Sequence, residues 1–237
     1  MTTRRTTLLI GAALLAGSVV GTGAVTPASA VAPSALGASL RPTLGLAPAS
    51  PWTVDSIPLG SDPLAALAAD GLRNWQIFAT TGLGDYLARF IAIRDAIAVE
   101  AARRIEVDPL RLKAAWAAAD HRHQVVLMAA MTQLGTPYRK RTNEPGKGFD
   151  CSGFTSFAWS ATDVLLPAQS RRQIRTVTPL TRDDAQPGDL VYYPGHISLY
   201  LGIDHAILHA PTYGGEVEFS HLRSSREDDV DFGGPIG

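Results

Sequence analysis

The spacing of apolar residues changes once along this chain, and that change restricts the fold class. Between residues 63 and 161, most apolar residues recur at intervals of three, four and seven, the period of amphipathic helices. From Leu190 onward they alternate with polar residues, which is the period of half-buried strands. The connections between these later segments are short, so the strands should pair antiparallel. Helices followed by a run of strands predict an α+β fold rather than a parallel sheet.

Aspartates mark the helix starts in the first half of the chain. Asp62 and Asp108 each precede a proline, and an Asp cap followed by Pro favours helix initiation. Asp85 can cap another helix between them. The pattern predicts three helices, the third of which runs without a break to Leu134 before Gly135 ends it. No sustained heptad indicates a coiled coil, so these helices are most simply a small packing unit.

Two histidines fall within the third expected helix. His121 and His123 are two positions apart, which places them about 200° apart around a helix. Side chains that point in such different directions cannot easily share a metal ion. We therefore interpret both as surface or interface residues.

The N-terminus has the pattern of a secretory signal peptide. Arg4 and Arg5 precede an apolar run over 8–20, and Ala28-Ser29-Ala30 is a small-residue cleavage site. We expect cleavage after Ala30. The alternative is a membrane anchor, but the apolar run is shorter than the roughly 20 residues that span a bilayer. Thr7 stands where the twin-arginine route would favour a bulky apolar residue, so we expect general export.

Composition divides the remainder into segments. Residues 31–60 are rich in Pro, Ala, Ser and Gly and read as a linker. We expect an α-helical accessory segment over 61–122 and a second domain over 123–237. The formal net charge is −1, and the basic run Arg139–Arg141 is too short for a nucleic-acid footprint. We therefore expect no nucleic-acid partner.

The chain has a single cysteine, Cys151, and its position suggests chemistry. It is flanked by Asp150 and Ser152, which favour helix caps, and it precedes a short amphipathic stretch ending at Ala161. The partial positive charge at a helix N-terminus stabilises a nucleophilic thiolate. The alternative is a small buried hydrophobic residue. Export favours chemistry, because a lone cysteine has no internal disulfide partner and risks oxidation.

Two histidines in the strand region could serve a cysteine nucleophile. If the strands on either side of a tight turn at Gly202-Ile203 pair, His196 lies directly opposite His209. Opposed residues share a face, with Cβ atoms roughly 4.5–5.5 Å apart. One imidazole could then act as the base while the other orients it.

The segment from Gly135 onward resembles the NlpC family of bacterial cell-wall cysteine peptidases. The matching pieces, in order, are Gly135-Thr136-Pro137-Tyr138, Phe149-Asp150-Cys151-Ser152-Gly153-Phe154, Leu166-Pro167 with Ser170 and Gln173, Pro187-Gly188-Asp189-Leu190, His196-Ile197-Ser198-Leu199-Tyr200-Leu201-Gly202 and Leu208-His209-Ala210. Each piece alone is weak, but six in this order over about 129–219 are specific. This chain departs from the family pattern at Arg139–Asn143, where family members often carry an aromatic residue and glycines.

The resemblance implies a papain-like α+β domain, with helices packed on an antiparallel sheet, and a defined set of site residues. Cys151 would be the nucleophile, His196 the base and His209 the orienting residue. Tyr138 would line the site, and Asp150 and Ser152 would help to bind the substrate peptide. No metal or cofactor is implied. The cationic run at 139–141 could meet substrate carboxylates, or it could be a solvated loop.

The function implied is that of a secreted peptidoglycan hydrolase located at the cell wall. It would cleave a stem peptide between D-γ-glutamyl and a diamino acid through a thioester. The alternatives are an amidase or acyltransferase on the same fold, a non-catalytic wall-binding module, and a metal site formed by Cys151, His196 and His209. The helical segment 61–122 could bind a protein partner, hold the domain off the membrane or cover the active-site cleft.

Overall fold

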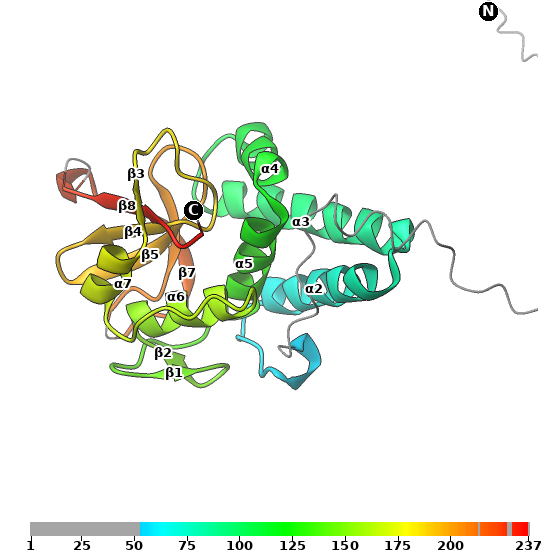
Figure 1. Ribbon diagram of the computed structural model, residues 1–237, viewed down its shortest axis with the longest axis horizontal. Helices are drawn as coiled ribbons and strands as arrows, with labels where there is room; N and C mark the ends of the chain where they lie inside the picture. Colours follow the sequence, from blue (N-terminus) through cyan, green and yellow to red (C-terminus); the bar gives the residue numbers. More distant parts are fainter. Residues whose placement is uncertain (1–52, 213, 227–228, 237) are drawn as a thin grey trace, which may run out of the picture. The chain divides into compact units, whose positions relative to one another are not determined.

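The computed structural model describes residues 53–212, 214–226 and 229–236 (Figure 1). The expected signal peptide and most of the expected linker lie outside these described residues. The helices are α2 (Pro63–Thr81), α3 (Gly84–Arg104), α4 (Pro109–Ala118), α5 (His121–Met131), α6 (Cys151–Ser160) and α7 (Ser170–Thr176), with short 3₁₀ turns η1 (Val54–Ser56) and η2 (Ser224–Arg226). The strands are β1 (Asn143–Glu144), β2 (Gly148–Phe149), β3 (Thr178–Leu180), β4 (Leu190–Tyr193), β5 (His196–Tyr200), β6 (Ala206–His209), β7 (Glu218–His221) and β8 (Asp231–Gly234).

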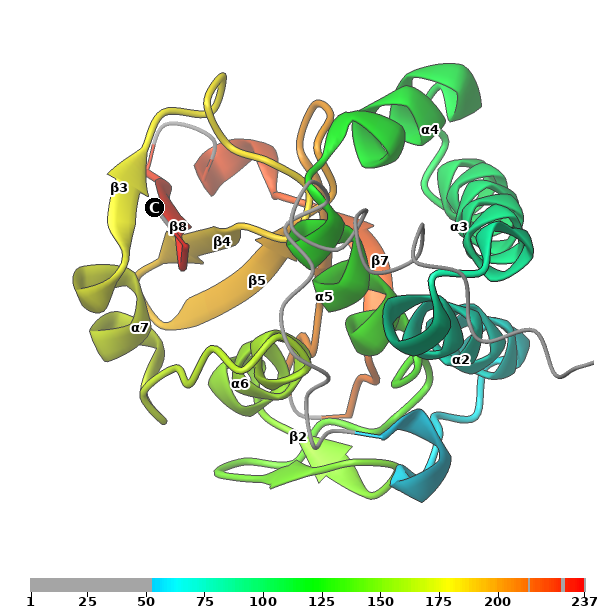
Figure 2. The same ribbon diagram turned by 45° about the vertical axis from the view of Figure 1, so that its right-hand side comes forward.

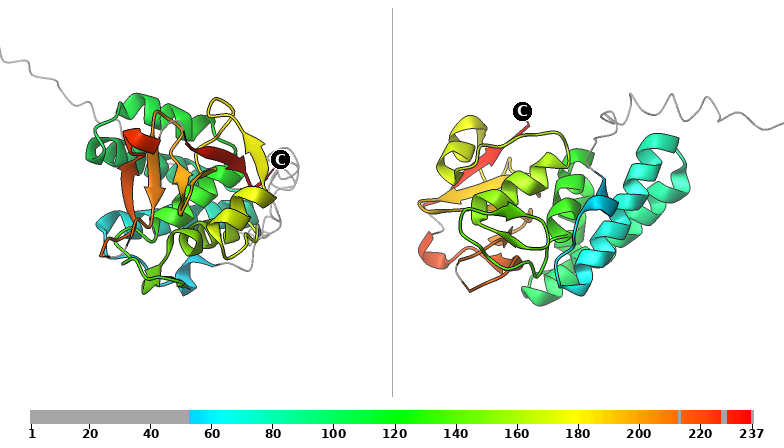
Figure 3. Two further views of the ribbon diagram at one scale, coloured as in Figure 1. Left: turned by 90° about the vertical axis from the view of Figure 1, so that its left-hand side faces the viewer. Right: turned by 90° about the horizontal axis from the view of Figure 1, so that it is seen from below.

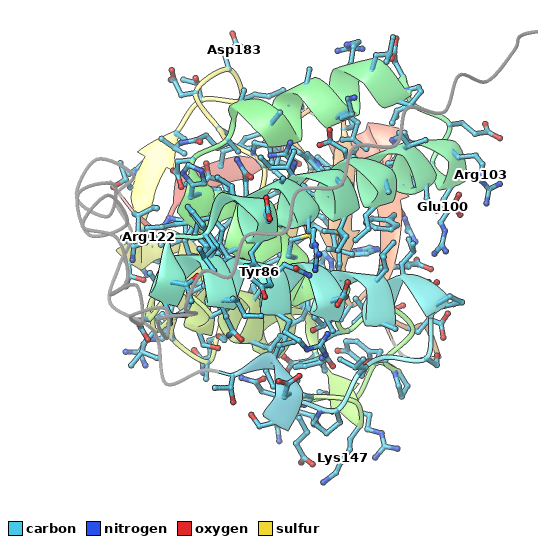
Figure 4. The ribbon with its side chains drawn as sticks, turned by 90° about the vertical axis from the view of Figure 1, so that its right-hand side faces the viewer. Tyr86, Glu100, Arg103, Arg122, Lys147 and Asp183 are labelled. Carbon is cyan, nitrogen blue, oxygen red and sulfur yellow. The ribbon has the colours of Figure 1, made fainter. Side chains whose placement is uncertain are left out.

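The predicted caps start two of the helices. The Asp62 side chain accepts a hydrogen bond from the Leu64 N–H at the start of α2, and Asp108 does the same for Leu110 in α4. The third prediction was wrong, because α3 begins at Gly84, one residue before Asp85, and has no side-chain cap. Its last turn carries an exposed ion pair of 2.7 Å between Arg103 and Glu100 (Figure 4).

The long third helix expected from the sequence is two helices. Ala119 is extended and ends α4, and Asp120 caps α5 by accepting from the N–H groups of Arg122 and His123. An Asp side chain competes for local backbone N–H groups and so favours a cap over a helix interior. The expected boundary between residues 122 and 123 lies within α5 and stays a prediction.

The main sheet has the order β3-β8-β4-β5-β6-β7, and all its pairings are antiparallel (Figure 2). Strands β4 to β7 form a meander, and β8 returns to lie between β3 and β4. A second small sheet pairs β1 with β2. The predicted α+β class is therefore confirmed.

The turn between β5 and β6 is longer than expected, which shifts the pairing. Leu199 pairs with Leu208 and Tyr200 with Ile207, so His196 is not directly opposite His209. The predicted two-residue turn was wrong by two residues of register. A shift of two leaves every side chain on its expected face.

One hydrophobic core runs through both the sheet domain and the preceding helices. Helix α5 lies between the α2–α3 hairpin and the sheet, and α6 packs on β5 (Figure 3). Trp116 of α4 is fully buried and donates a 2.9 Å hydrogen bond to the Leu201 carbonyl at the end of β5. In the described part of the chain, no helix combines the length and hydropathy needed to cross a bilayer.

Candidate active site

Cys151 is the first residue of α6, and the preceding aspartate fixes the start of the helix. One carboxylate oxygen of Asp150 accepts from the Gly153 N–H at 2.7 Å, and the other accepts from the Arg141 N–H at 2.9 Å. Ser152 donates its hydroxyl to the Ala168 carbonyl at 2.7 Å. Asp150 therefore joins the cysteine turn to the cationic loop that precedes it.

The sulfur of Cys151 lies against the start of β5. Its environment includes a hydrogen bond with the backbone N–H of Ile197, the residue that follows His196. The nucleophile predicted on α6 and the base predicted on β5 are thus brought to the same edge of the helix–sheet interface.

Burial controls the protonation of the cysteine in the free protein. It raises the pKa of the Cys151 thiol, against the hydrogen bonds from Ile197 and Ser152, while Asp150 raises it further. The N–H groups at the start of α6 do lower the pKa of the thiol, but burial outweighs them. Burial, with a smaller effect of His209, also lowers the pKa of His196 to about 3. Both shifts favour the neutral forms, a thiol at Cys151 and an imidazole at His196.

The two predicted histidines are in direct contact. The Nε2 atom of His196 lies 2.9 Å from Nδ1 of His209, and the rings meet edge to face with centroids 5.0 Å apart. Both residues are buried. The two histidines are diagonal neighbours on one face of β5 and β6. Side chains as large as imidazoles can still touch across this longer diagonal. Tyr193 packs on the other side of the His196 ring, with centroids 5.2 Å apart.

A groove of about 520 Å³ opens beside the cysteine. Its wall includes Tyr138, Lys140, Arg141, Asp150, Cys151 and Ser152. All three residues predicted to form the substrate site, Tyr138, Asp150 and Ser152, thus line the same groove as Cys151. Two cations of the 139–141 run also line it. No residue of α2 to α4 is part of this wall as far as the structure describes it.

A buried glutamine supports the cysteine helix and had been given no role from sequence. The side-chain amide of Gln173 donates to the Ser152 carbonyl at 2.9 Å and to the Pro167 carbonyl at 2.8 Å. Its oxygen accepts from the Thr155 hydroxyl at 2.7 Å. Gln173 therefore ties α7 and the preceding loop to the first turns of α6. Its place in the motif series was the only sequence signal.

His123 was interpreted as a surface or interface residue, and the structure places it in the interior. Its ring lies between two carboxylates, 2.6 Å from Asp120 Oδ2 and 3.0 Å from Asp189 Oδ1. Burial alone would lower the pKa of His123, but these two partners raise it to about 9. The ring also packs edge-on against Trp159. His123 therefore joins α5 to the turn that starts β4.

Among the residues that the structure describes, no group of three or more His, Cys, Asp or Glu side chains could hold a metal ion. The chemistry that the arrangement can perform is nucleophilic. A thiol lines a groove with cationic walls, and its sulfur lies against the backbone of the strand that carries one of two contacting imidazoles.

Comparisons with known proteins identify this part of the chain. A model of the NlpC/P60 family matches residues 135–231. A probable endopeptidase of Mycobacterium tuberculosis is 38% identical over 103 residues, which are 42% of this chain and 26% of that protein. Gamma-DL-glutamyl hydrolase of Bacillus subtilis is 28% identical over 126 residues, which are 49% of this chain and 30% of that protein.

The solved structures similar to this chain include the P60 domain of an antigen from M. avium subspecies paratuberculosis. It has a TM-score of 0.43 and 25% identity, covering 49% of this chain and 96% of that one. The chain spans about a third or less of the length of the two curated relatives above. On the family match, residues 135–231 are an NlpC/P60 domain.

Proposed function

We propose that this protein is a cysteine endopeptidase that cleaves peptidoglycan stem peptides between D-γ-glutamyl and a diamino acid. The observation that carries the proposal is the position of Cys151, which lines a groove at the start of α6 and lies against the backbone N–H of Ile197, the residue that follows the His196 of the buried His196–His209 pair. One relative named as a probable endopeptidase supports the reaction class, and another named as a gamma-DL-glutamyl hydrolase supports the γ-glutamyl bond. We further propose that the protein is exported and acts at the cell wall, as its N-terminal sequence predicts.

The first half of the reaction starts from the neutral pair. His196 takes the Cys151 S–H proton as the sulfur attacks the substrate carbonyl, which forms the S–C bond. Backbone N–H groups at the start of α6 are suited to stabilise the oxyanion. The imidazolium then gives its proton to the leaving amine as the C–N bond breaks, leaving a thioester.

In the second half, neutral His196 takes a proton from water as the water oxygen attacks the thioester. Collapse of this second tetrahedral species breaks the S–C bond, and the proton returns to sulfur. His209 holds the His196 ring in the orientation that both halves need. The enzyme returns to its starting state with no metal or cofactor in the sequence of steps.

Substrate charge fits the groove. Stem peptides carry free carboxylates, and Lys140 and Arg141 place cationic groups on the groove wall. Asp150, whose oxygens are engaged by the backbone, acts on the substrate mainly by holding this loop beside Cys151. Tyr138 supplies an aromatic wall.

Point substitutions test the assignment with purified muropeptides. We expect Cys151→Ala and His196→Gln each to lower kcat at least about 1000-fold, because each removes a group that makes or breaks bonds. His205→Gln is the matched control, since His205 lies in the β5–β6 turn outside the groove, and its rate should equal that of wild type. Undiminished cleavage by Cys151→Ala would falsify the proposal.

Mass spectrometry of the same digests identifies the bond. New termini at D-glutamate and at the diamino acid support the endopeptidase. Release of an intact peptide from the glycan would indicate an amidase, and a transferred acyl group would indicate an acyltransferase. No product together with slow labelling of Cys151 by an alkylating probe would indicate a wall-binding module.

A further inference from the structure

The ring of His209 has a second nitrogen that the proposed mechanism leaves unused. Nδ1 faces His196, but Nε2 is buried and has no hydrogen-bond partner among the described residues. A buried ring nitrogen without a partner is unfavourable, and such groups in folded proteins usually have an explanation. An oxygen of Glu218 lies 3.7 Å from this nitrogen.

Glu218 is held at this place by its strand. It pairs directly with His209 across β6 and β7, so the two side chains share a face and their Cβ atoms are close. The preceding residue, Val217, exchanges backbone hydrogen bonds with Gly135 and Thr136, at 2.9 and 2.8 Å. The backbone is thus fixed on both sides, while the carboxylate is half-exposed and able to rotate. A small rotation closes 3.7 Å to a charge-assisted hydrogen bond.

We propose that Glu218 is a positioning residue that selects the tautomer of both histidines. Its carboxylate accepts the Nε2–H of His209, which leaves His209 Nδ1 as an acceptor. That atom accepts the Nε2–H of His196, and the other nitrogen of His196, Nδ1, then carries the lone pair that takes the Cys151 proton. The effect of these tautomers on catalysis rests on the proposed function. The tautomers themselves do not depend on it.

The alternative chain of tautomers shows why a selector matters. If His209 carried its proton on Nδ1, it would donate to His196 Nε2, and the His196 proton would sit on Nδ1. The base would then offer the sulfur a proton instead of a lone pair. The 2.9 Å contact between the rings is compatible with either arrangement, so it cannot choose between them. The negative charge of Glu218, next to His209 Nε2, favours only the arrangement in which that nitrogen carries the proton.

The same carboxylate favours the transition state. When Cys151 gives up its proton, the His196–His209 pair becomes cationic, and Glu218 is the carboxylate 3.7 Å from that pair. Tyr193, which packs on the His196 ring, offers no carboxylate, and Asp150, which acts on the Cys151 thiol, has both oxygens engaged by backbone N–H groups. Glu218 is not among the residues that line the groove, so its removal should affect turnover rather than substrate binding.

Glu218→Ala and Glu218→Gln, compared with Glu216→Ala and Glu216→Gln, test this. Glu216 is an exposed carboxylate two residues earlier, beside Pro137, and so matches the change in charge. We expect both Glu218 variants to lower kcat about 10-fold with KM within about twofold of wild type. Both Glu216 variants should keep both constants. Glu218→Gln preserves size, which separates loss of charge from loss of packing.

Imidazole ¹⁵N–¹H correlation spectra of the folded protein give a readout that needs no substrate, with His209 assigned through a His209→Asn variant. We expect the Nε2–H form of His209 in wild type and in Glu216→Ala, and a mixture or the Nδ1–H form in Glu218→Ala. An unchanged tautomer in Glu218→Ala would overturn the proposal, as would a loss of activity carried by KM. If wild type cleaves no muropeptide, the spectra still decide the tautomer question, so failure of the proposed function is distinguishable.

Discussion

At the scale of single residues, side chains with local signals were predictable and those with distant partners were not. Cys151 is marked by its flanking cap residues, and His196 and His209 by strand alternation. Gln173 acts through carbonyl groups on other segments, 21 residues away in the case of Ser152. Asp150 was predicted to contact substrate, but sequence alone could not show that backbone N–H groups occupy both its oxygens.

Asp150 both caps α6 and holds the loop at Arg141, and substitution of its side chain should affect both. Asp150→Asn keeps one acceptor for the Gly153 N–H but places an NH₂ group where the Arg141 N–H needs an oxygen. We expect the free energy of unfolding to fall by about 1–2 kcal/mol. We also expect kcat/KM to fall roughly tenfold as the loop moves from Cys151. Urea unfolding and muropeptide cleavage measure the two effects.

Asp183→Asn provides the control for Asp150→Asn, because Asp183 lies in an exposed turn (Figure 4) and is not among the residues that line the groove. It should change neither quantity. Wild-type stability in Asp150→Asn would mean that the two backbone hydrogen bonds do not hold the loop.

At the scale of elements, helix starts and strand faces followed from the sequence, whereas one helix break and one turn length did not. The break at Ala119–Asp120 depends on Asp120 also binding His123, whose other partner, Asp189, is 66 residues further on. The β5–β6 turn uses a backbone with positive φ at Gly202 and at Asp204. Asp tolerates that region, but nothing in its neighbours required it there.

The junction between α5 and the turn before β4 should make stability depend on pH. The pKa of His123 is about 9 in the folded protein and about 6.5 for an ordinary histidine, so folding favours the protonated form. Its contribution is fully present below about pH 6.5 and is lost as pH rises through about 9. It amounts to on the order of 3 kcal/mol, because the ring is buried.

Urea unfolding at several pH values measures this contribution. We expect the difference in unfolding free energy between wild type and His123→Gln to shrink steadily from pH 6.5 to pH 9.5. His205→Gln, which lies outside the cluster, should follow the wild-type pH dependence throughout. A difference independent of pH would show that His123 contributes packing and not charge.

At the scale of the whole molecule, the sequence predicted a helical segment followed by a peptidase-like domain, but not how far the two are merged. Trp116 is fully buried in the shared core and binds the end of β5, and His221 of β7 contacts the Ile105 carbonyl at 2.6 Å. These contacts span about 85 and 116 residues of chain. Amphipathic periodicity shows that a helix has an apolar face, but it does not show which surface covers that face.

A shared core predicts a single unfolding transition. We expect tryptophan fluorescence, which includes Trp75 in the helical segment and Trp159 in α6, to change at the same urea concentration as far-UV circular dichroism. Trp116→Phe should lower the midpoint for both probes together, since it removes one buried hydrogen bond and some packing. Two separated transitions would contradict this and would show that the helices and the sheet fold as independent units.

The pairing of β5 with β6 limits which changes of hairpin register keep the two histidines in contact. Alternation along a strand encodes which side of a sheet a ring occupies, and it leaves the identity of the facing residue open. A chain whose hairpin slides by an even number of positions still brings two imidazoles within contact, as happens here. An odd slide would separate them by the thickness of the sheet.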